Sequence, residues 1–514
     1  MKPMIKPFKK TLWILGIALV ILPAAIVTTA CRSGNGNYKN VVYINDQTDF
    51  DHHSGTEFPE GTIILFAGGV EFKGQFVLKG NGTADLPNMV AAYDIESKEV
   101  FDEWTDNKAV VNGLGEVESA IYLYNGQHWE INNLEITNTN GTTDDQGELK
   151  GIYVVAEDAG IINNITINNC FVHDVNGHVG GKWKGGIHLH VIGDSIKTKF
   201  HQVLIEDNVI KDVGGVGIGN QSSWRNIDTE KYYPWTNFII RGNFIERTGR
   251  NSIILRNAID PLIEYNVASG SSRFDTGHSI VNFNTINCIV QYNEAYGNIG
   301  PENENERGGF DADYKSTGTI IQYNYSHDNN WFCGIMRRGK NSDITIRYNI
   351  SQNELLGSYL YGFPTEFGLK DVKVYNNVHY FGKGMGNTIF VEGGKVRHPI
   401  ETTFRNNIFY FEDEAEWGFE PGNSCLFEHN LFYNVSPKGT NAITSDPLLV
   451  DPGKGGTNIN MKDPERLAGY RLKSNSPCIN AGVTIGNNGG KDFWGNELNS
   501  ESTNIGVYAG KNNQ

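Results

Sequence analysis

The chain has 514 residues and a formal net charge of -16, with 60 glycines and 6 methionines. The excess of negative charge excludes nucleic acid as the expected partner, because its phosphates would be repelled. The many glycines and the lack of a long helical hydrophobic period predict a turn-rich, all-β chain that forms one long domain.

The first thirty residues have the composition of a bacterial export signal. Four lysines in the first ten residues precede an apolar stretch over 12–27 and a run of small residues that ends at Cys31. This run resembles a lipobox, although Thr28 stands where leucine is usual. We predict a signal peptide over 1–30, lipid attachment at Cys31 and a tether over 31–40, which would anchor the protein in the outer membrane of a bacterial cell envelope. Ordinary signal cleavage and an uncleaved anchor are the alternatives.

From about residue 130 onward, one asparagine recurs between two short apolar segments. Successive copies lie roughly 23 to 39 residues apart, which is the spacing of a solenoid with insertions. The clear copies are Asn208, Asn243, Asn266, Asn293, Asn324, Asn349, Asn377, Asn407 and Asn430, and weaker copies are Asn133 and Asn169.

Each repeat contains period-two runs, so we expect one coil of three short strands rather than a pair of helices. Strands of one coil pair with the equivalent strands of the next, which predicts an all-β parallel β-helix over 41–436. An asparagine at the same turn of every coil can bond to open backbone groups and tolerates left-handed geometry. We therefore interpret the asparagines as scaffold.

The opening coils carry a family resemblance. The segment GTIILFAGGVEFKGQFVLKGNGTADLP, followed by HWEINNLEITN and INNCFVHDVNG, is similar to right-handed parallel β-helix enzymes of the pectate-lyase-like superfamily. The resemblance covers nearly the whole mature chain. It implies a carbohydrate-active protein, although the superfamily includes lyases, hydrolases, esterases and surface proteins without activity. Residues 437–514 resemble the closing segment that caps such solenoids.

The cysteines lack metal-binding or redox spacing. They are expected to be small interior residues of the coils rather than disulfides or metal ligands. This group contains Cys170, Cys288, Cys333, Cys425 and Cys478.

Stacking the third strands of successive coils places polar side chains in columns on the outer face, because side chains alternate along a strand. We expect these columns to contact the substrate. They contain His188, His190, Gln221, Arg256, Asp311, Asp313, Arg338, Tyr361 and Glu392. Aromatic residues are also expected to stack on sugar rings. They are Trp183, Trp224, Tyr232, Tyr233 and Trp235 in the insertions and Trp331 just before the strand of Arg338.

Asp311 and Asp313, in the segment GGFDADY, are the main catalytic candidates. Two positions apart on one strand, their carboxylates would lie about 7 Å apart, which suits an inverting glycoside hydrolase. Asp275, in SRFDTGHS, is the next candidate for a second carboxylate, against a turn-forming role. Arg338 would keep one carboxylate ionised, and the negative charge of that carboxylate would raise the pKa of the other.

His188 and His190 resemble a metal pair but lack a third ligand, so we predict substrate contact or a proton-transfer role and no metal centre. No cofactor is expected to be required. Calcium is left open for Glu302, Glu304 and Glu306, which otherwise form a solvated acidic loop.

The sequence is compatible with three functions. A glycoside hydrolase acting on a plant or algal poly- or oligosaccharide, with or without uronic acid, is favoured by the aspartate pair. A polysaccharide lyase or dehydratase-type enzyme would use Arg256, Arg338, His188, His190 or Tyr361. A glycan-binding β-helix without activity is the third hypothesis. The motifs of pectate lyases and polygalacturonases are absent from the sequence. A monomer is expected.

Overall fold

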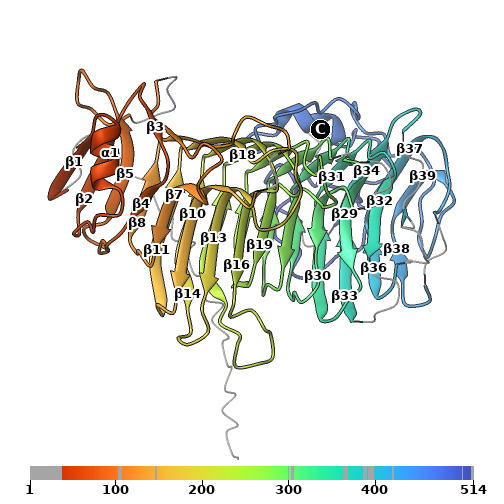
Figure 1. Cartoon of the computed structure of the whole chain (residues 1–514). Coiled ribbons are helices and arrows are strands. Elements are labelled where there is room, and N and C mark those ends of the chain that lie inside the picture. Colours follow the sequence, from red (N-terminus) through yellow and green to blue (C-terminus); the bar gives the residue numbers. More distant parts are fainter. Residues whose placement is uncertain are drawn as a thin grey trace, which may run out of the picture. The chain divides into compact units, whose positions relative to one another are not determined.

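The structure is a computed structural model that describes residues 38–101, 107–144, 147–298, 300–301, 306–362, 368–385, 390–391, 399–418, 422–499 and 502–510. These residues form three parallel β-sheets, each containing one strand from almost every coil (Figure 1). The chain passes through the sheets in the order A, B, C and then begins the next coil. The prediction of an all-β parallel β-helix is confirmed.

Sheet A contains β1 (Asn40–Ile44), β2 (Thr62–Ala67), β5 (Asn88–Tyr93), β8 (Trp129–Asn132), β11 (Ile161–Asn168), β14 (Lys199–Glu206), β17 (Trp235–Arg241), β20 (Ala258–Ile259), β21 (Leu262–Glu264), β24 (Ile289–Gln291), β27 (Ile320–Gln322), β30 (Asn341–Arg347), β33 (Leu369–Tyr375), β36 (Thr402–Arg405) and β38 (Leu426–Glu428). Sheet B contains β3 (Glu71–Lys73), β6 (Val110–Asn112), β9 (Glu135–Asn138), β12 (Phe171–Val175), β15 (Val209–Val213), β18 (Phe244–Thr248), β22 (Val267–Ser269), β25 (Glu294–Tyr296), β28 (Tyr325–His327), β31 (Ile350–Gln352), β34 (Val378–Phe381), β37 (Ile408–Ala415) and β39 (Leu431–Val435). Sheet C contains β4 (Phe76–Leu78), β7 (Ser119–Tyr124), β10 (Lys150–Glu157), β13 (Gly185–Ile192), β16 (Val216–Ser222), β19 (Ile253–Arg256), β23 (Ile280–Phe283), β26 (Gly308–Ala312), β29 (Trp331–Met336), β32 (Gly357–Gly362) and β35 (Phe390–Val391).

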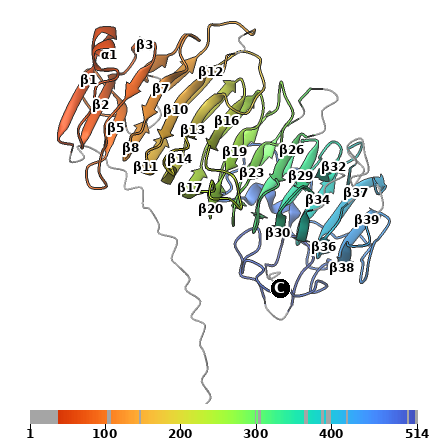
Figure 2. The same ribbon diagram turned by 60° about the horizontal axis from the view of Figure 1, so that its bottom comes forward.

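Two short helices complete the described elements. The helix α1 (Gln47–His53) begins at Asp46, whose carboxylate accepts hydrogen bonds from the backbone N–H groups of Thr48 and Asp49. This is a standard way to satisfy the open donors at a helix N-terminus. Figure 2 shows α1 beside the first strands of the solenoid. A 3-10 helix, η1 (Glu465–Tyr470), lies in the C-terminal segment.

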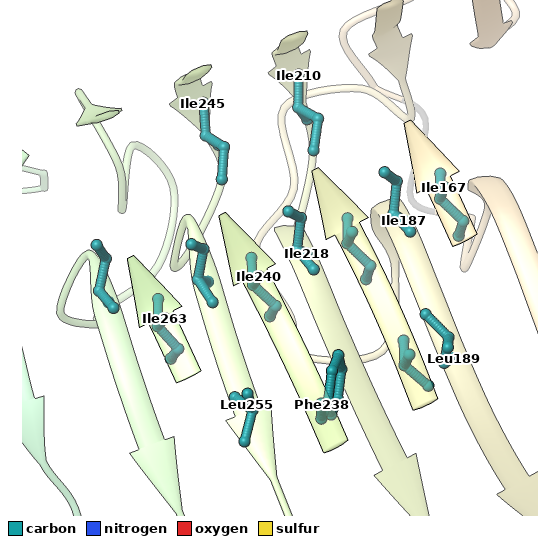
Figure 3. Packing of buried hydrophobic residues seen from close by; sticks show 14 of the residues in the cluster. Ile167, Ile187, Leu189, Ile210, Ile218, Phe238, Ile240, Ile245, Leu255 and Ile263 are labelled. Carbon is teal, nitrogen blue, oxygen red and sulfur yellow. The ribbon is translucent and has the colours of Figure 1, made fainter. Parts of the chain in front are cut away.

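The interior of the solenoid is filled by aliphatic side chains stacked coil on coil. Ile187 and Ile218 of sheet C pair in register and lie in one buried cluster with Ile210 of sheet B and Ile240 of sheet A (Figure 3). The period-two pattern of the sequence therefore points every second residue inward. It leaves the alternate residues of sheet C on its outer face.

The recurring asparagines form a buried ladder at the turn between sheets A and B. The side-chain amide of each of the nine clear copies but the last donates to the Oδ1 atom of the next copy, at 2.9–3.1 Å, as between Asn266 and Asn293. The backbone N–H group of Asn266 also donates to Oδ1 of Asn293. The scaffold role predicted from the sequence agrees with this geometry.

The left-handed residue at this turn is the one before the ladder asparagine, which differs from our expectation. Tyr265, Tyr292 and Tyr323 precede ladder asparagines and have φ values of 56°, 54° and 56°. Asn133 and Asn169, the weaker copies, have φ values of 56° and 54° and so occupy this preceding position instead. They are not members of the ladder.

The described part of the C-terminal segment packs along the solenoid. The backbone N–H group of Ile459 donates to Glu294 of β25 at 2.6 Å, and the Tyr470 hydroxyl donates to Gln352 of β31 at 2.6 Å. Further along, the Arg347 guanidinium donates to the carbonyl of Asn487. These contacts enclose a second hydrophobic core that includes Leu467 and Tyr470. The segment therefore joins coils that are far apart in the sequence.

The described cysteines form no disulfide, and all but Cys425 are buried. Cys31 lies outside the described residues. In the part of the chain that the structure describes, no helix is long and apolar enough to cross a membrane.

Candidate active site

Polar side chains gather on the outer face of sheet C. The register places His188 beside Gly219, then Ile254, Val281 and Asp311 in successive coils. Two residues further along the same strands, His190 lies beside Gln221, and Arg256 lies beside Phe283. By the same register Asp313 continues this second column, directly after β26.

Asp311 is buried, with 5% of its surface exposed. Its Oδ2 atom lies 3.9 Å from Nε2 of His278, and its Oδ1 atom has no hydrogen-bond partner. The backbone N–H group of Gly308 donates to Nδ1 of His278, so the neutral imidazole carries its proton on Nε2, toward Asp311. Burial lowers the pKa of His278 to about 3.

Burial also raises the pKa of Asp311 well above its usual range, and the charges of Asp313 and Glu306 act in the same direction. The charge of Lys182 opposes them. These influences together favour the protonated form of Asp311.

Asp313 is only partly buried and so is open to a bound molecule. Burial raises the pKa of Asp313 to about 7; a hydrogen bond from the backbone N–H group of Tyr314 lowers it and the charge of Glu306 raises it. The charges of Lys182 and Arg256 lower it further. A carboxyl group with this pKa is about half protonated at neutral pH, as a general acid requires.

Lys182 and Glu306 belong to the site but were not predicted as catalytic residues. Both come from loops that precede strands of sheet C, and both act on the pKa of Asp313. Burial lowers the pKa of Lys182, as do the neighbouring charges of Arg250 and Arg256. Their positions depend on loop conformation, for which the strand pattern carries no signal.

Arg256 is held rigidly on the outer face. Its guanidinium donates to the backbone carbonyl of Asn220 at 2.9 Å and lies 4.8 Å from the ring centre of Trp183. Burial lowers the pKa of Arg256 to about 9. Trp183 is 37% exposed, so its ring offers a flat surface beside Arg256.

Arg338 differs in part from expectation. Its guanidinium lies 5.0 Å from the ring centre of Tyr314, next to Asp313 in the sequence. The charges that act on the Asp313 pKa are those of Glu306, Lys182 and Arg256. Arg338 is thus placed beside the site but is not among the groups that set this pKa.

The two histidines of β13 are neutral. Nε2 of His188 bonds to the Lys184 carbonyl at 3.0 Å, and Nδ1 of His190 bonds to the Tyr153 hydroxyl at 2.9 Å. Burial lowers the pKa of His188 to about 3 and that of His190 to about 4. Across the described ranges, no group of three or more His, Cys, Asp or Glu side chains is arranged to hold a metal ion.

Four aromatic residues predicted to contact sugar are buried instead. Tyr361 pairs in register with the interior residue Ile335, so it points inward, where its hydroxyl bonds to Thr402. The error arose from assigning this strand the wrong alternation. The tryptophans fill the interior or lie beneath loops: Trp224 is 6% exposed, Trp235 is 0% exposed and Trp331 is 1% exposed.

Asp275 is already engaged by a neighbouring loop. Its Oδ2 atom accepts a hydrogen bond from the Arg250 guanidinium at 2.6 Å, and its Oδ1 atom accepts one from the Thr276 backbone. Asp275 therefore orders the loop before β23 and is not among the charges that set the pKa of Asp313. Glu302, Glu304 and Glu392 lie outside the described residues.

Three parallel sheets with a polar outer face define the class: the chain is a right-handed parallel β-helix protein. No family model matches the sequence.

Among curated proteins, the chain is similar to lacto-N-biosidase of Bifidobacterium longum subsp. longum, with 27% identity over 561 aligned positions. The match covers 89% of this chain and 34% of the relative, so the chain spans about a third of that protein's length.

Among solved structures, the fold resembles the GH136 lacto-N-biosidase from Eubacterium ramulus, in its native form (TM-score 0.54, 18% identity, 71% of this chain and 68% of that chain). The selenomethionine form of the same enzyme gives a TM-score of 0.54 at 19% identity, over 68% of this chain and 66% of that chain.

Proposed function

We propose that the protein is a glycoside hydrolase that degrades a poly- or oligosaccharide bound on the outer face of sheet C. The observation that carries the proposal is the partly exposed Asp313, with a pKa raised to about 7, between Glu306 and the cations Lys182 and Arg256. The similarity to lacto-N-biosidase supports this reaction class.

Asp313 would protonate the glycosidic oxygen as the general acid. Asp311, about 7 Å away along the strand, is the second carboxylate that the sequence suggests, and this separation leaves room for water. However, the burial and negative charges that raise the pKa of Asp311 disfavour the ionised form that a base requires. The charges favour Glu306 as the ionised partner, because its negative charge raises the pKa values of both aspartates.

The finer description of the substrate rests on the sequence alone. The export signal and the β-helix resemblance support a plant or algal glycan, with or without uronic acid. Lipid anchoring through Cys31 at the outer membrane is part of the same proposal.

A polysaccharide lyase is the second candidate, and one observation favours it. The amine of Lys182, with its lowered pKa, lies near Arg250 and Arg256, which is the combination of base and cations that β-elimination of a uronate needs. Tyr361 no longer supports this reaction, because it is buried.

The test is to incubate the protein with a panel of neutral and acidic glycans and to measure released reducing ends beside ultraviolet absorbance of unsaturated sugars. Release of reducing ends without absorbance supports hydrolysis, and a rise in absorbance supports elimination. If neither signal changes, both proposed reactions are contradicted. Asp313→Asn should lower the rate by about 100-fold or more.

Two further variants, Glu306→Gln and Asp311→Asn, separate the possible second carboxylates. The matched control is Asp343→Asn, an exposed residue that pairs with Lys373 on sheet A. It should leave the rate unchanged. An Asp313→Asn enzyme with the wild-type rate would remove Asp313 from the mechanism.

A further inference from the structure

A hollow lies on the outer face of sheet C, at the ends of β13 and β16. Its volume is about 280 Å³. It is lined by His190, Gln221, Ser223, Arg225, Asn226 and the intervening backbone. None of these residues is used in the mechanism proposed above.

The hollow shares a column of sheet C with Asp313. Gln221 lies three strands from Asp313 and His190 lies four strands away, with Arg256 between them. At about 4.8 Å per strand, the separation is roughly 14 to 19 Å. A glycan held at Asp313 must therefore extend past Arg256 and Trp183 to reach the hollow.

Arg225 gives the hollow a positive charge. The described residues contain no ion pair to its exposed guanidinium, and two acids of the neighbouring loops are engaged by lysines. Asp194 pairs with Lys231 at 3.2 Å, and Asp228 pairs with Lys340. This local excess contrasts with the net charge of -16 of the whole chain.

The other lining groups are neutral hydrogen-bonding groups. Burial lowers the pKa of His190 to about 4, and the charges of Lys150 and Arg225 act in the same direction. His190 is thus uncharged at neutral pH, in part because of the positive charges of Lys150 and Arg225. Within the described ranges, the side-chain amides of Gln221 and Asn226 have no protein partner and can donate to a ligand.

We propose that this hollow is a subsite for the anionic group, a carboxylate or a sulfate, of an acidic sugar within the bound glycan. A guanidinium can bind either group through two parallel hydrogen bonds, and the two amides add neutral donors. The inference rests on the proposed function in one respect: it assumes that the glycan lies along the outer face of sheet C.

The test measures binding rather than turnover, with the protein carrying Asp313→Asn so that no substrate is consumed. The probes are matched oligosaccharide pairs: an oligogalacturonide and its carboxyl-reduced form, a sialylated oligosaccharide and its desialylated form, and a sulfated galactan oligosaccharide and its desulfated form. We expect at least one acidic member to bind about 10-fold more tightly than its neutral partner, and the preferred pair distinguishes carboxylate from sulfate.

Adding Arg225→Gln should abolish that preference while leaving the affinity for the neutral partner unchanged. The matched control is Lys231→Gln, which removes a cation from the same loop that is already paired with Asp194. It should keep the preference.

Equal affinities within every pair, or no binding by any acidic member, would overturn the subsite. So would a preference that survives Arg225→Gln. These results are separable from failure of the proposed hydrolase. If the protein prefers the acidic glycan but the wild type hydrolyses nothing, the subsite is supported and the hydrolase is contradicted. If the protein hydrolyses neutral glycans but shows no acidic preference, the hydrolase is supported and the subsite is contradicted.

Discussion

Replacing one asparagine in the middle of the ladder tests whether the repeated residue is structural. The Oδ1 atom of Asn293 accepts hydrogen bonds from the backbone and side-chain N–H groups of Asn266, both at 2.9 Å. Its amide donates to the carbonyls of Ile263 and Gln291 and to Oδ1 of Asn324. Asn293→Ala removes all five bonds from a residue that is fully buried.

The expected cost follows from the groups left behind. The backbone N–H of Asn266 and the carbonyl of Ile263 both lose their side-chain partner in the interior. At about 1–3 kcal/mol for each unsatisfied buried group, the free energy of unfolding should fall by roughly 2–6 kcal/mol. Because the ladder is remote from Asp313, the residual folded protein should keep its rate.

The assay is equilibrium unfolding in guanidinium chloride, followed by tryptophan fluorescence. The matched control is Asn81→Ala, which removes one exposed hydrogen bond, from the Gln127 backbone at 3.0 Å. This change should cost no more than about 0.5–1.5 kcal/mol. If Asn293→Ala were no more destabilising than Asn81→Ala, the ladder would not be a main source of stability.

Three further predictions concern the site. If Asp313 is the general acid, kcat/KM should fall as pH rises through about 7, to roughly a tenth of its maximum at pH 8, whereas a fall in kcat/KM that is already centred near pH 4 would contradict the assignment. The folded-state pKa of Asp311 is raised above its unfolded value, so its protonated form stabilises the fold below about pH 3.8 and this contribution is lost as pH rises. Asp311→Asn should therefore lose less thermal stability than the wild type between pH 5 and pH 9; parallel Tm curves would refute this. Trp183→Ala should weaken glycan binding by about 10-fold, measured by titration, because the exposed ring is lost. The control Tyr43→Ala, which removes an exposed ring at the first strand, should have no effect. Equal affinities of Trp183→Ala and the wild type would exclude Trp183 from the subsites.

The fold could be predicted because its determinants are local and repeated. Each ladder asparagine sits between two short strands, and interior residues such as Ile187 and Leu189 alternate with the polar His188 and His190. The same alternation correctly turned Asp311 and Asp313 outward. It failed at Tyr361, because Leu360 was taken as the inward residue of this strand. In the structure Tyr359 and Tyr361 face inward instead.

The composition of the site was harder to predict, because loops supply half of it. Lys182, Trp183 and Glu306 precede strands of sheet C and reach the outer face only through the path of their loops. The sequence also did not reveal which rings are buried: Trp235 and Trp331 lie inside, whereas Trp183 is 37% exposed. Aromatic residues in an insertion are therefore a poor guide to sugar contacts unless their exposure is known.

The C-terminal segment changes the order in which the coils of the solenoid are expected to unfold. In a simple solenoid each coil contacts only its neighbours, so the end coils can open one at a time. Here Ile459 is bonded to Glu294 in β25, Tyr470 to Gln352 in β31 and Asn487 to Arg347 in β30. Opening the last coils thus requires breaking contacts made to much earlier ones. Lys462 also lies 5.5 Å from the ring centre of Tyr265, between β21 and β22. The coils from β21 onward should therefore exchange their amide hydrogens as one cooperative block, and the coils before β21 should exchange independently of it.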